Sequence, residues 1–264
     1  MHHAISIPGS RIRAFLSDGI RLGRIFGIPI YIDLSWLVVF AFVAYLNSTS
    51  FAQVHPQWAP QRDWIIAAFA SLLFFVCVLL HELAHSVVAQ HYRVPVLSIT
   101  LFLFGGVAQV GREPANARQE FNIAIAGPLA SVLLGLLLYS SIWILPQNET
   151  ANALLLCLSG ANISLALFNL LPGLPLDGGR CLRAVIWGLR KDFKRATRIA
   201  HTSGKLVGFC LVSVGVNGFG LGAAPGWGGL GLIFAGSFLM TCALANETAV
   251  SESSTTTARP ERSL

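Results

Sequence analysis

The chain has 264 residues, of which 54% are hydrophobic and only 11% are charged, and its mean hydropathy is +0.66. A soluble globular domain carries roughly 25% charged residues, so this composition excludes an ordinary water-soluble protein and indicates a protein of the lipid bilayer. The net charge of +6 does not indicate a nucleic-acid partner, because the basic residues stand beside apolar segments, where they act as topology signals.

The apolar stretches predict an all-α, polytopic membrane fold with about six transmembrane helices, since one crossing takes about 20 residues. A glycine-rich stretch around Pro225-Gly226 separates the last two, so one broken hairpin is the alternative there. We expect a cytoplasmic N-terminal segment at 1–27, a transmembrane domain at 28–246 and a polar, disordered tail at 247–264. The predicted spans are Ile28–Leu46, Trp64–Gln90, Ile123–Leu145, Ala151–Leu171, Leu206–Ala224 and Leu230–Ala245.

The distribution of basic residues predicts the orientation of these spans. Every Lys and Arg except Arg62 falls before the first span, between spans 2 and 3, between spans 4 and 5, or after span 6. Those segments share one side of the membrane, and loops rich in Lys and Arg stay in the cytoplasm. Both termini are therefore expected to be cytoplasmic.

Two segments between the spans differ from the rest. Residues Pro95–Gly111 are too short to cross as a helix and rich in β-branched and aromatic residues, which predicts a small β element at the cytoplasmic face between spans 2 and 3. Residues Arg180–Arg198 mix basic with apolar side chains, which predicts a short helix on an anionic membrane surface. The cysteines stand singly and predict neither a disulfide framework nor a cysteine metal site.

The second predicted span ends in the sequence His81-Glu82-Leu83-Ala84-His85, which has the HExxH pattern. Residues four apart lie on one face of a helix, so the two imidazoles can bind one metal ion while Glu82 stands beside its water. Helix packing is the alternative role, but ionisable groups at membrane depth are costly and are functional by default.

A catalytic zinc site needs a third protein ligand and an open position. Predicted spans 2 and 4 run in the same direction, which places Asp177 at a depth similar to that of the histidines. Two prolines and two glycines in segment 169–179 (NLLPGLPLDGG) free the backbone to aim a carboxylate, although an exposed Asp-Gly turn is the alternative. The sequence favours Asp177 among several candidates, which are Asp33, His55, His91, Asp177, His201 and a few loop acids.

HELAH at 81–85 and GANISLALFNLLPGLPLDGGR at 160–180 resemble the two signature elements of the site-2 protease family of intramembrane zinc metalloproteases. The similarity begins at Gly27 and extends to the fourth predicted span. The resemblance makes 28–246 a protease domain with one zinc ion. It implies that His81, His85 and Asp177 bind the zinc, that Glu82 is the general base, and that Asn169 stands beside the reacting carbonyl.

The segment Phe104-Gly105-Gly106-Val107 also resembles a family element, as does Ala126-Gly127-Pro128. Glycines permit close backbone approach, so Gly105 and Gly106 are candidates for binding an extended substrate at a strand edge, and a simple turn is the alternative. Some relatives carry a PDZ insertion or a CBS pair. The loop at 146–150 is too short for the former, and no CBS domain follows the last span in this chain.

The resemblance implies hydrolysis of peptide bonds within or near the bilayer, in a single-pass membrane protein such as an anti-sigma factor. It implies a bacterial or archaeal cell membrane, contact with lipid and no nucleic acid. A catalytically silent membrane binding or chaperone protein of the same fold is the alternative. A membrane di-iron oxidase is disfavoured because it needs around eight histidines in several boxes, and this chain has seven scattered ones.

Overall fold

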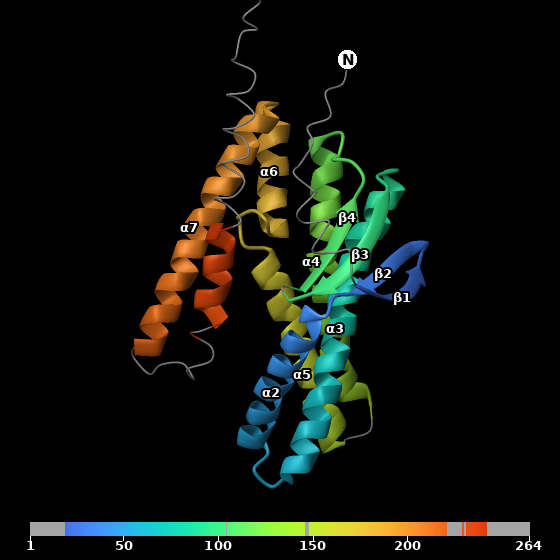
Figure 1. The fold of residues 1–264 in the computed structure, drawn as a ribbon, viewed down its shortest axis with the longest axis vertical. Helices are drawn as coiled ribbons and strands as arrows, with labels where there is room; N and C mark the ends of the chain where they lie inside the picture. The colour runs from blue at the N-terminus through green and yellow to red at the C-terminus, as the bar shows by residue number, and fades with distance from the viewer. Residues whose placement is uncertain (1–18, 104, 146–147, 221–228, 230, 242–264) are drawn as a thin grey trace, which may run out of the picture. The chain divides into compact units, whose positions relative to one another are not determined.

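The computed structural model describes residues 19–103, 105–145, 148–220, 229 and 231–241. The chain divides into two compact units, one of Met1–Pro114 with Ala126–Ala166 and one of Ala115–Ile125 with Leu167–Leu264 (Figure 1). The predicted tail, the Pro225-Gly226 turn and the first 18 residues lie outside the described residues. The elements in chain order are β1 (Ile20–Ile25), β2 (Ile28–Ile32), α2 (Ser35–Val54), α3 (Pro60–His91), β3 (Val96–Phe102), β4 (Gly105–Val110), α4 (Ala117–Ile144), α5 (Glu149–Asn169), α6 (Asp177–Arg190) and α7 (Phe193–Gly220).

The predicted polytopic helical fold is confirmed. Within the described residues, five helices are long and apolar enough to cross a membrane, namely α2, α3, α4, α5 and the part of α7 at Phe193–Gly218. A shorter apolar helix covers Gly231–Thr241, inside the region predicted as the sixth span. Predicted spans 2, 3 and 4 each match one helix with small shifts at the ends.

The start of the first predicted span is wrong. Residues Ile28–Ile32 form strand β2, and the membrane helix α2 begins only at Ser35, whose N–H donates to Asp33 Oδ1 at 2.8 Å. In β2, Ile28 and Ile30 are buried, whereas Pro29 between them and Tyr31 after them are partly exposed. An apolar strand buried on one face has the same hydropathy as the first turns of a membrane helix, so hydropathy did not separate them.

A four-stranded sheet of order β1-β2-β3-β4 accompanies the helices of the first unit. The predicted β element is confirmed as the antiparallel pair β3–β4, but β1 and β2 were not predicted. Strand β2 pairs with β3 in parallel, with Ile30 opposite Ile99. Parallel neighbours need a crossover, and here the chain runs through both α2 and α3 before it returns as β3. Strands β1 and β4 are the two edges.

The sheet is held against the C-terminal half of α3. Ile28 of β2 and Ile99 of β3, both fully buried, pack on Leu83 of α3. Burial of such side chains contributes about 1.5–3 kcal/mol each. Because Leu83 lies inside the HExxH segment, this packing places the sheet directly beside the candidate site.

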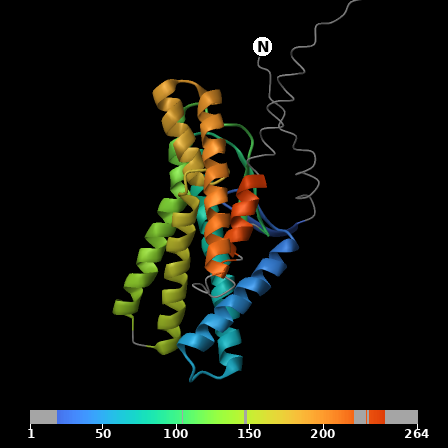
Figure 2. The ribbon, with the colours of Figure 1, turned by 90° about the vertical axis from the view of Figure 1, so that its left-hand side faces the viewer.

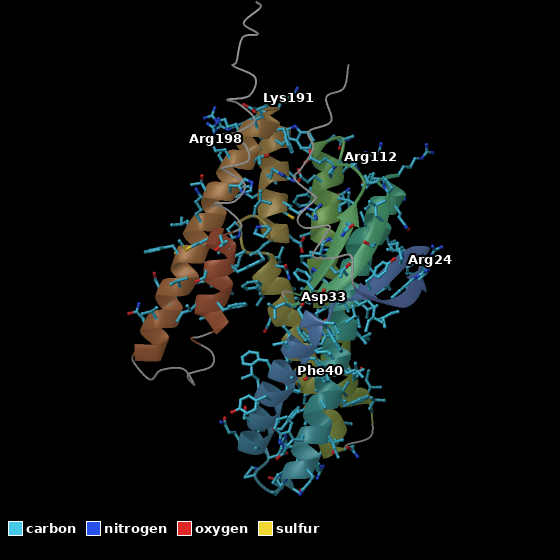
Figure 3. The ribbon with its side chains drawn as sticks, in the orientation of Figure 1. Arg24, Asp33, Phe40, Arg112, Lys191 and Arg198 are labelled. Atoms are coloured by element: carbon cyan, nitrogen blue, oxygen red, sulfur yellow. The ribbon has the colours of Figure 1, made fainter. Side chains whose placement is uncertain are left out.

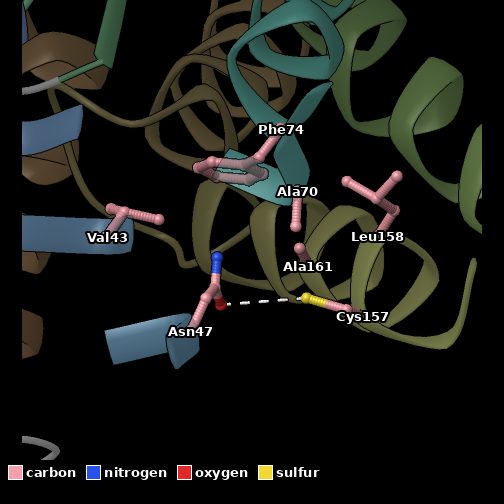
Figure 4. A pocket seen from close by; sticks show the side chains of 7 residues that line it. All are labelled: Val43, Asn47, Ala70, Phe74, Cys157, Leu158 and Ala161. Atoms are coloured by element: carbon pink, nitrogen blue, oxygen red, sulfur yellow. Dashed lines mark hydrogen bonds between the residues drawn. The ribbon is translucent and has the colours of Figure 1, made fainter. Parts of the chain in front are cut away.

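The other half of the first unit contains a pocket between α2, α3 and α5, shown in Figure 4. Its volume is about 150 Å³, and its lining is apolar apart from Asn47 and Cys157. Asn47 donates to Ser71 Oγ at 3.0 Å and accepts a weak bond from Cys157 Sγ at 3.8 Å. Its polar groups are thus satisfied within the bundle, and the described lining includes none of the candidate site residues.

In the second unit, α6 and α7 lie side by side (Figures 1 and 2). The predicted surface helix over Arg180–Arg198 is wrong in extent, because the chain breaks at Lys191, which has a left-handed φ of 55°. Asp192 Oδ1 then accepts the N–H of Arg195 at 2.9 Å and caps the start of α7. Consequently α7 begins at Phe193, well before the predicted fifth span.

Candidate metal centre

The two histidines of the HExxH pattern lie on one face of α3, as the spacing predicted. Both are buried, and His85 Nε2 lies 3.2 Å from His81 Nε2. Neutral imidazole nitrogens are good zinc ligands, and two of them one helical turn apart can bind the same ion. The arrangement therefore offers one ligand atom from each ring on the same side of the helix.

The ring of His81 is oriented by a neighbour from α4. Its Nδ1 lies 2.9 Å from Ser131 Oγ, and Ser131 is itself buried. When Nδ1 carries the hydrogen, it donates to the serine and leaves Nε2 with a free lone pair for metal. Metal-binding histidines commonly have such a partner, which fixes both the tautomer and the ring orientation.

Gly127 lets α4 pack directly against these two nitrogens. A Cβ atom built at this position would lie 2.1 Å from His85 Nε2 and 2.6 Å from His81 Nε2. No side chain fits there unless the rings move. The two buried imidazole nitrogens, held 3.2 Å apart, are a donor pair that fits a zinc ion.

Glu82 lies next to the histidines and beside the β4 edge strand. A Cβ atom at Gly106 would lie 2.5 Å from Glu82 Cγ, so the backbone of β4 approaches this carboxylate as closely as a glycine allows. Gly105 has a φ of 115° and open space around its Cβ position. Both glycines belong to β4, so the simple-turn interpretation of these residues is wrong.

In the second unit, Asp177 is the first residue of α6 and is buried. A carboxylate is favoured at a helix N-terminus, where the peptide dipoles give a partial positive charge. Arg180, one turn further on, has its NH1 atom 3.9 Å from Asp177 Oδ1. The alternative of an exposed Asp-Gly turn is wrong, because Asp177 is 8% exposed and helical.

The glycines after Asp177 let the preceding loop fold onto the first turn of α6. A Cβ atom at Gly178 would lie 2.2 Å from the carbonyl oxygen of Leu170, and one at Gly179 would lie 2.2 Å from the backbone of Gly173. Asn169, the last residue of α5, precedes this loop and is half-buried. The motif from Asn169 to Gly179 is therefore a compact structure that fixes where α6 starts.

A buried ion pair holds α6 to the first turns of α4 within the second unit. Arg183 Nε donates to Glu120 Oε1 at 2.7 Å, and Glu120 is fully buried. The Arg183 guanidinium also lies 5.0 Å from the centre of the Phe193 ring. Burial, together with the charge of Asp177, raises the pKa of the Cys181 thiol to about 11.

Two of the other candidates for the third metal ligand make contacts of a different kind. Asp33 caps α2, and His55 stacks on Trp58 with a ring distance of 4.1 Å and contacts Glu149 at 3.2 Å. Sequence reasoning missed Ser131 and gave no role to Gly127. The signal was present, since these two residues are four apart on α4 and lie on one helix face.

Comparison with known proteins agrees with this geometry. The family model of peptidase family M50 matches residues 69–154 and 144–213. The chain is 38% identical over 201 residues to sll0528 of Synechocystis sp., and 35% identical over 240 residues to Rip3 of Mycobacterium tuberculosis. Both relatives carry zinc metalloprotease in their names. The alignments cover 76% and 89% of this chain but only 53% and 60% of those relatives.

A solved structure has the same fold. The site-2 protease from Methanocaldococcus jannaschii superposes with a TM-score of 0.59 and 32% identity, covering 86% of this chain and 94% of that one. The family model covers the helix with both histidines and the segment that leads to Asp177. Sequence, site geometry and fold agree, and the chain belongs to peptidase family M50.

Proposed function

We propose that this chain is an intramembrane zinc endopeptidase that hydrolyses a peptide bond of a membrane-protein substrate. The observation that carries the proposal is the pair of buried imidazole nitrogens 3.2 Å apart, against which α4 packs closely at Gly127. The Glu82 carboxylate lies next to these histidines, and a catalytically silent binding protein of this fold would not need it. Membership of family M50 supports the same activity.

One zinc ion per chain is the cofactor, held by His81, His85 and Asp177. Each of these side chains is buried and offers one ligand atom. Two neutral imidazoles and one carboxylate make up a common ligand set of catalytic zinc, and they leave a position open for water. The bound ion supplies Lewis acidity, which lowers the pKa of a water from about 15.7 toward 7.

Glu82 acts as the general base. It follows His81 on α3 and is only half-buried, so it can face the water beside the ligand atoms. Its carboxylate takes the water proton as oxygen attacks the substrate carbonyl, and then delivers the proton to the leaving amine. Asn169 donates a hydrogen bond to the oxyanion that forms on the former carbonyl.

The substrate is an extended segment of a single-pass membrane protein, such as an anti-sigma factor, bound along β4 at Gly105 and Gly106. A helical substrate hides its carbonyls in hydrogen bonds and must unwind before attack. An unpaired strand edge offers backbone groups to the unwound segment, and β4 is an edge strand whose backbone lies beside Glu82. Both termini of the protease are cytoplasmic, in a bacterial or archaeal cell membrane.

The comparison of two variants tests this proposal. Glu82→Gln removes the base but no ligand, so the purified protein should keep its zinc while cleavage falls by about 10²- to 10⁴-fold. Membrane proteomics of cells with wild-type or Glu82→Gln protein should reveal substrate fragments that vanish with the variant. Asp177→Asn replaces an anionic ligand by a neutral one, so zinc should bind more weakly.

Asp192→Asn is the matched control, because it makes the same chemical change at the cap of α7. It should leave the zinc affinity, measured by competition with a chelator, at the wild-type value. If Asp177→Asn also retains wild-type affinity while His91→Ala loses zinc, the third ligand is misassigned. Fragments that persist with Glu82→Gln would show that Glu82 is not the base.

A further inference from the structure

The β1–β2 hairpin presents large apolar side chains that are exposed among the described residues of the first unit. Phe26 and Gly27 form its two-residue turn, and Phe26 is 70% exposed. Ile20 and Leu22 of β1 are 60% and 59% exposed. An exposed apolar group of this size at the edge of a sheet indicates a surface that contacts lipid or another protein.

The backbone of the turn holds an aromatic residue in a conformation that such residues do not favour. Phe26 has a φ of 51° and Gly27 a φ of 78°. Two-residue hairpin turns with both values positive favour Asn-Gly or Asp-Gly, and a bulky side chain is unfavourable at the first position. Strain of this kind occurs often at functional positions, which makes the Phe26 ring a candidate for a contact outside the fold.

The charges on the hairpin indicate which kind of surface it would bind. Arg21 and Arg24 are both exposed on β1, and Figure 3 shows Arg24 at the far end of the hairpin. The sequence from Gly19 to Ile32 contains no acidic residue. Within the described residues, neither arginine has a salt bridge to an acidic side chain. A segment that combines an exposed aromatic ring with two such arginines is complementary to a layer of anionic lipid headgroups over acyl chains.

The position of the turn along α3 agrees with this partner. Gln90 Nε2, in the last turn of α3, donates to the carbonyl oxygen of Phe26 at 3.4 Å. Helix α3 is a candidate membrane span that ends at His91, and Tyr92 and Arg93 follow it. Aromatic and basic residues gather where a span leaves the hydrocarbon. The turn therefore lies at the level of the lipid headgroups.

We propose that the β1–β2 hairpin is a docking site for anionic phospholipid, in which the Phe26 ring enters the acyl-chain boundary and Arg21 and Arg24 bind headgroup phosphates. Each arginine near an anionic surface should strengthen the contact about fivefold. A docked protein segment is the competing occupant, and it would need acidic groups of its own to match the two arginines.

Depth-dependent quenching tests the proposal on the full-length chain in nanodiscs of phosphatidylcholine, alone or mixed with phosphatidylglycerol. The probe is the variant Phe26→Trp. The wild-type protein has six tryptophans, and its emission is subtracted from that of the variant to give the signal of the added tryptophan. Lipids brominated near the headgroup should quench the added tryptophan, more strongly when phosphatidylglycerol is present, while acrylamide should not. Quenching by acrylamide alone places the ring in water, and protection from both quenchers places it under protein; either result overturns the proposal.

Charge variants distinguish binding of lipid headgroups by the arginines from insertion of the apolar side chain alone. In the Phe26→Trp background, Arg24→Glu should abolish the dependence on phosphatidylglycerol, and Arg24→Lys should preserve it. Free inorganic phosphate added to the neutral nanodiscs should not reproduce the effect. Equal quenching of all three proteins in both lipid mixtures would overturn the role of the arginines.

Phe26→Asn controls for folding. Asparagine is well tolerated at positive φ, so the thermal midpoint in detergent should stay the same or rise. In nanodiscs, the upward shift of that midpoint caused by phosphatidylglycerol should be smaller than for wild type. A shift of undiminished size would mean that Phe26 does not contact the anionic lipid.

Discussion

At the scale of single residues, Gly127 determines whether the two histidines can share a metal. In Gly127→Ala, the new methyl group would lie within 2.6 Å of both Nε2 atoms, so zinc affinity should fall sharply. The stability of the helix itself should not decrease, since Ala in a helix interior is more favourable than Gly by about 0.5–1 kcal/mol. Chelator competition and thermal unfolding of the metal-free protein measure the two effects separately.

Gly160→Ala is the matched control for that variant. Gly160 also lies within a membrane helix, α5, but a Cβ atom there meets no other atom within 4 Å. This variant should retain wild-type zinc affinity. Equal zinc affinities of the two alanine variants would refute the idea that a side chain at Gly127 displaces the ligand rings.

At the scale of elements, the β4 edge can be tested by removing single backbone donors. Neighbouring N–H groups of a strand point alternately toward the partner strand and outward, and Val107 and Ala108 lie opposite Thr100 and Ile99 of β3. One of the variants Val107→Pro and Ala108→Pro removes an N–H that points outward, away from β3. That variant should slow substrate cleavage but leave folding and zinc content unchanged. Wild-type cleavage by both variants would reject substrate addition to this edge.

The ion pair between α4 and α6 allows a second test at this scale. Glu120→Ala would leave the Arg183 cation without its buried partner, which should lower the free energy of unfolding by about 3–5 kcal/mol. Replacing both residues by Met should be much less harmful, because no uncompensated charge remains. Denaturant or thermal unfolding in detergent measures both. A double variant as unstable as the single one would contradict this explanation.

At the scale of the whole molecule, the charge distribution predicts the topology. Every basic residue except Arg62 falls on one side of the predicted spans, and loops rich in Lys and Arg stay cytoplasmic. A reporter inserted after Asp192, between α6 and α7, should be cytoplasmic, and one inserted after Asn148 should be external. A reporter after Asn148 that is protected from external reagents would reverse the proposed orientation.

The sequence was informative where function depends on spacing along one helix, and less so where it depends on contacts between elements. The positions of His81 and His85 follow from a separation of one helical turn. The role of Gly127 depends on how α4 packs on α3, more than 40 residues away, and no local pattern encodes that approach. Strand β2 was missed because its apolar residues have the same hydropathy as the first turns of a membrane helix, and β1, which carries Arg21 and Arg24, lies in the segment predicted as the cytoplasmic N-terminus.

The parallel pairing of β2 with β3 also sets an order of assembly. During synthesis, β2 emerges before α2 and α3, and its partner β3 exists only after both membrane helices have been made. The sheet cannot close earlier, so β4 cannot take its place beside Glu82 in a partly inserted chain. A nascent chain that stalls between the two helices therefore contains neither the strand edge nor the complete HExxH helix. The candidate site forms only when the insertion of this unit is well advanced.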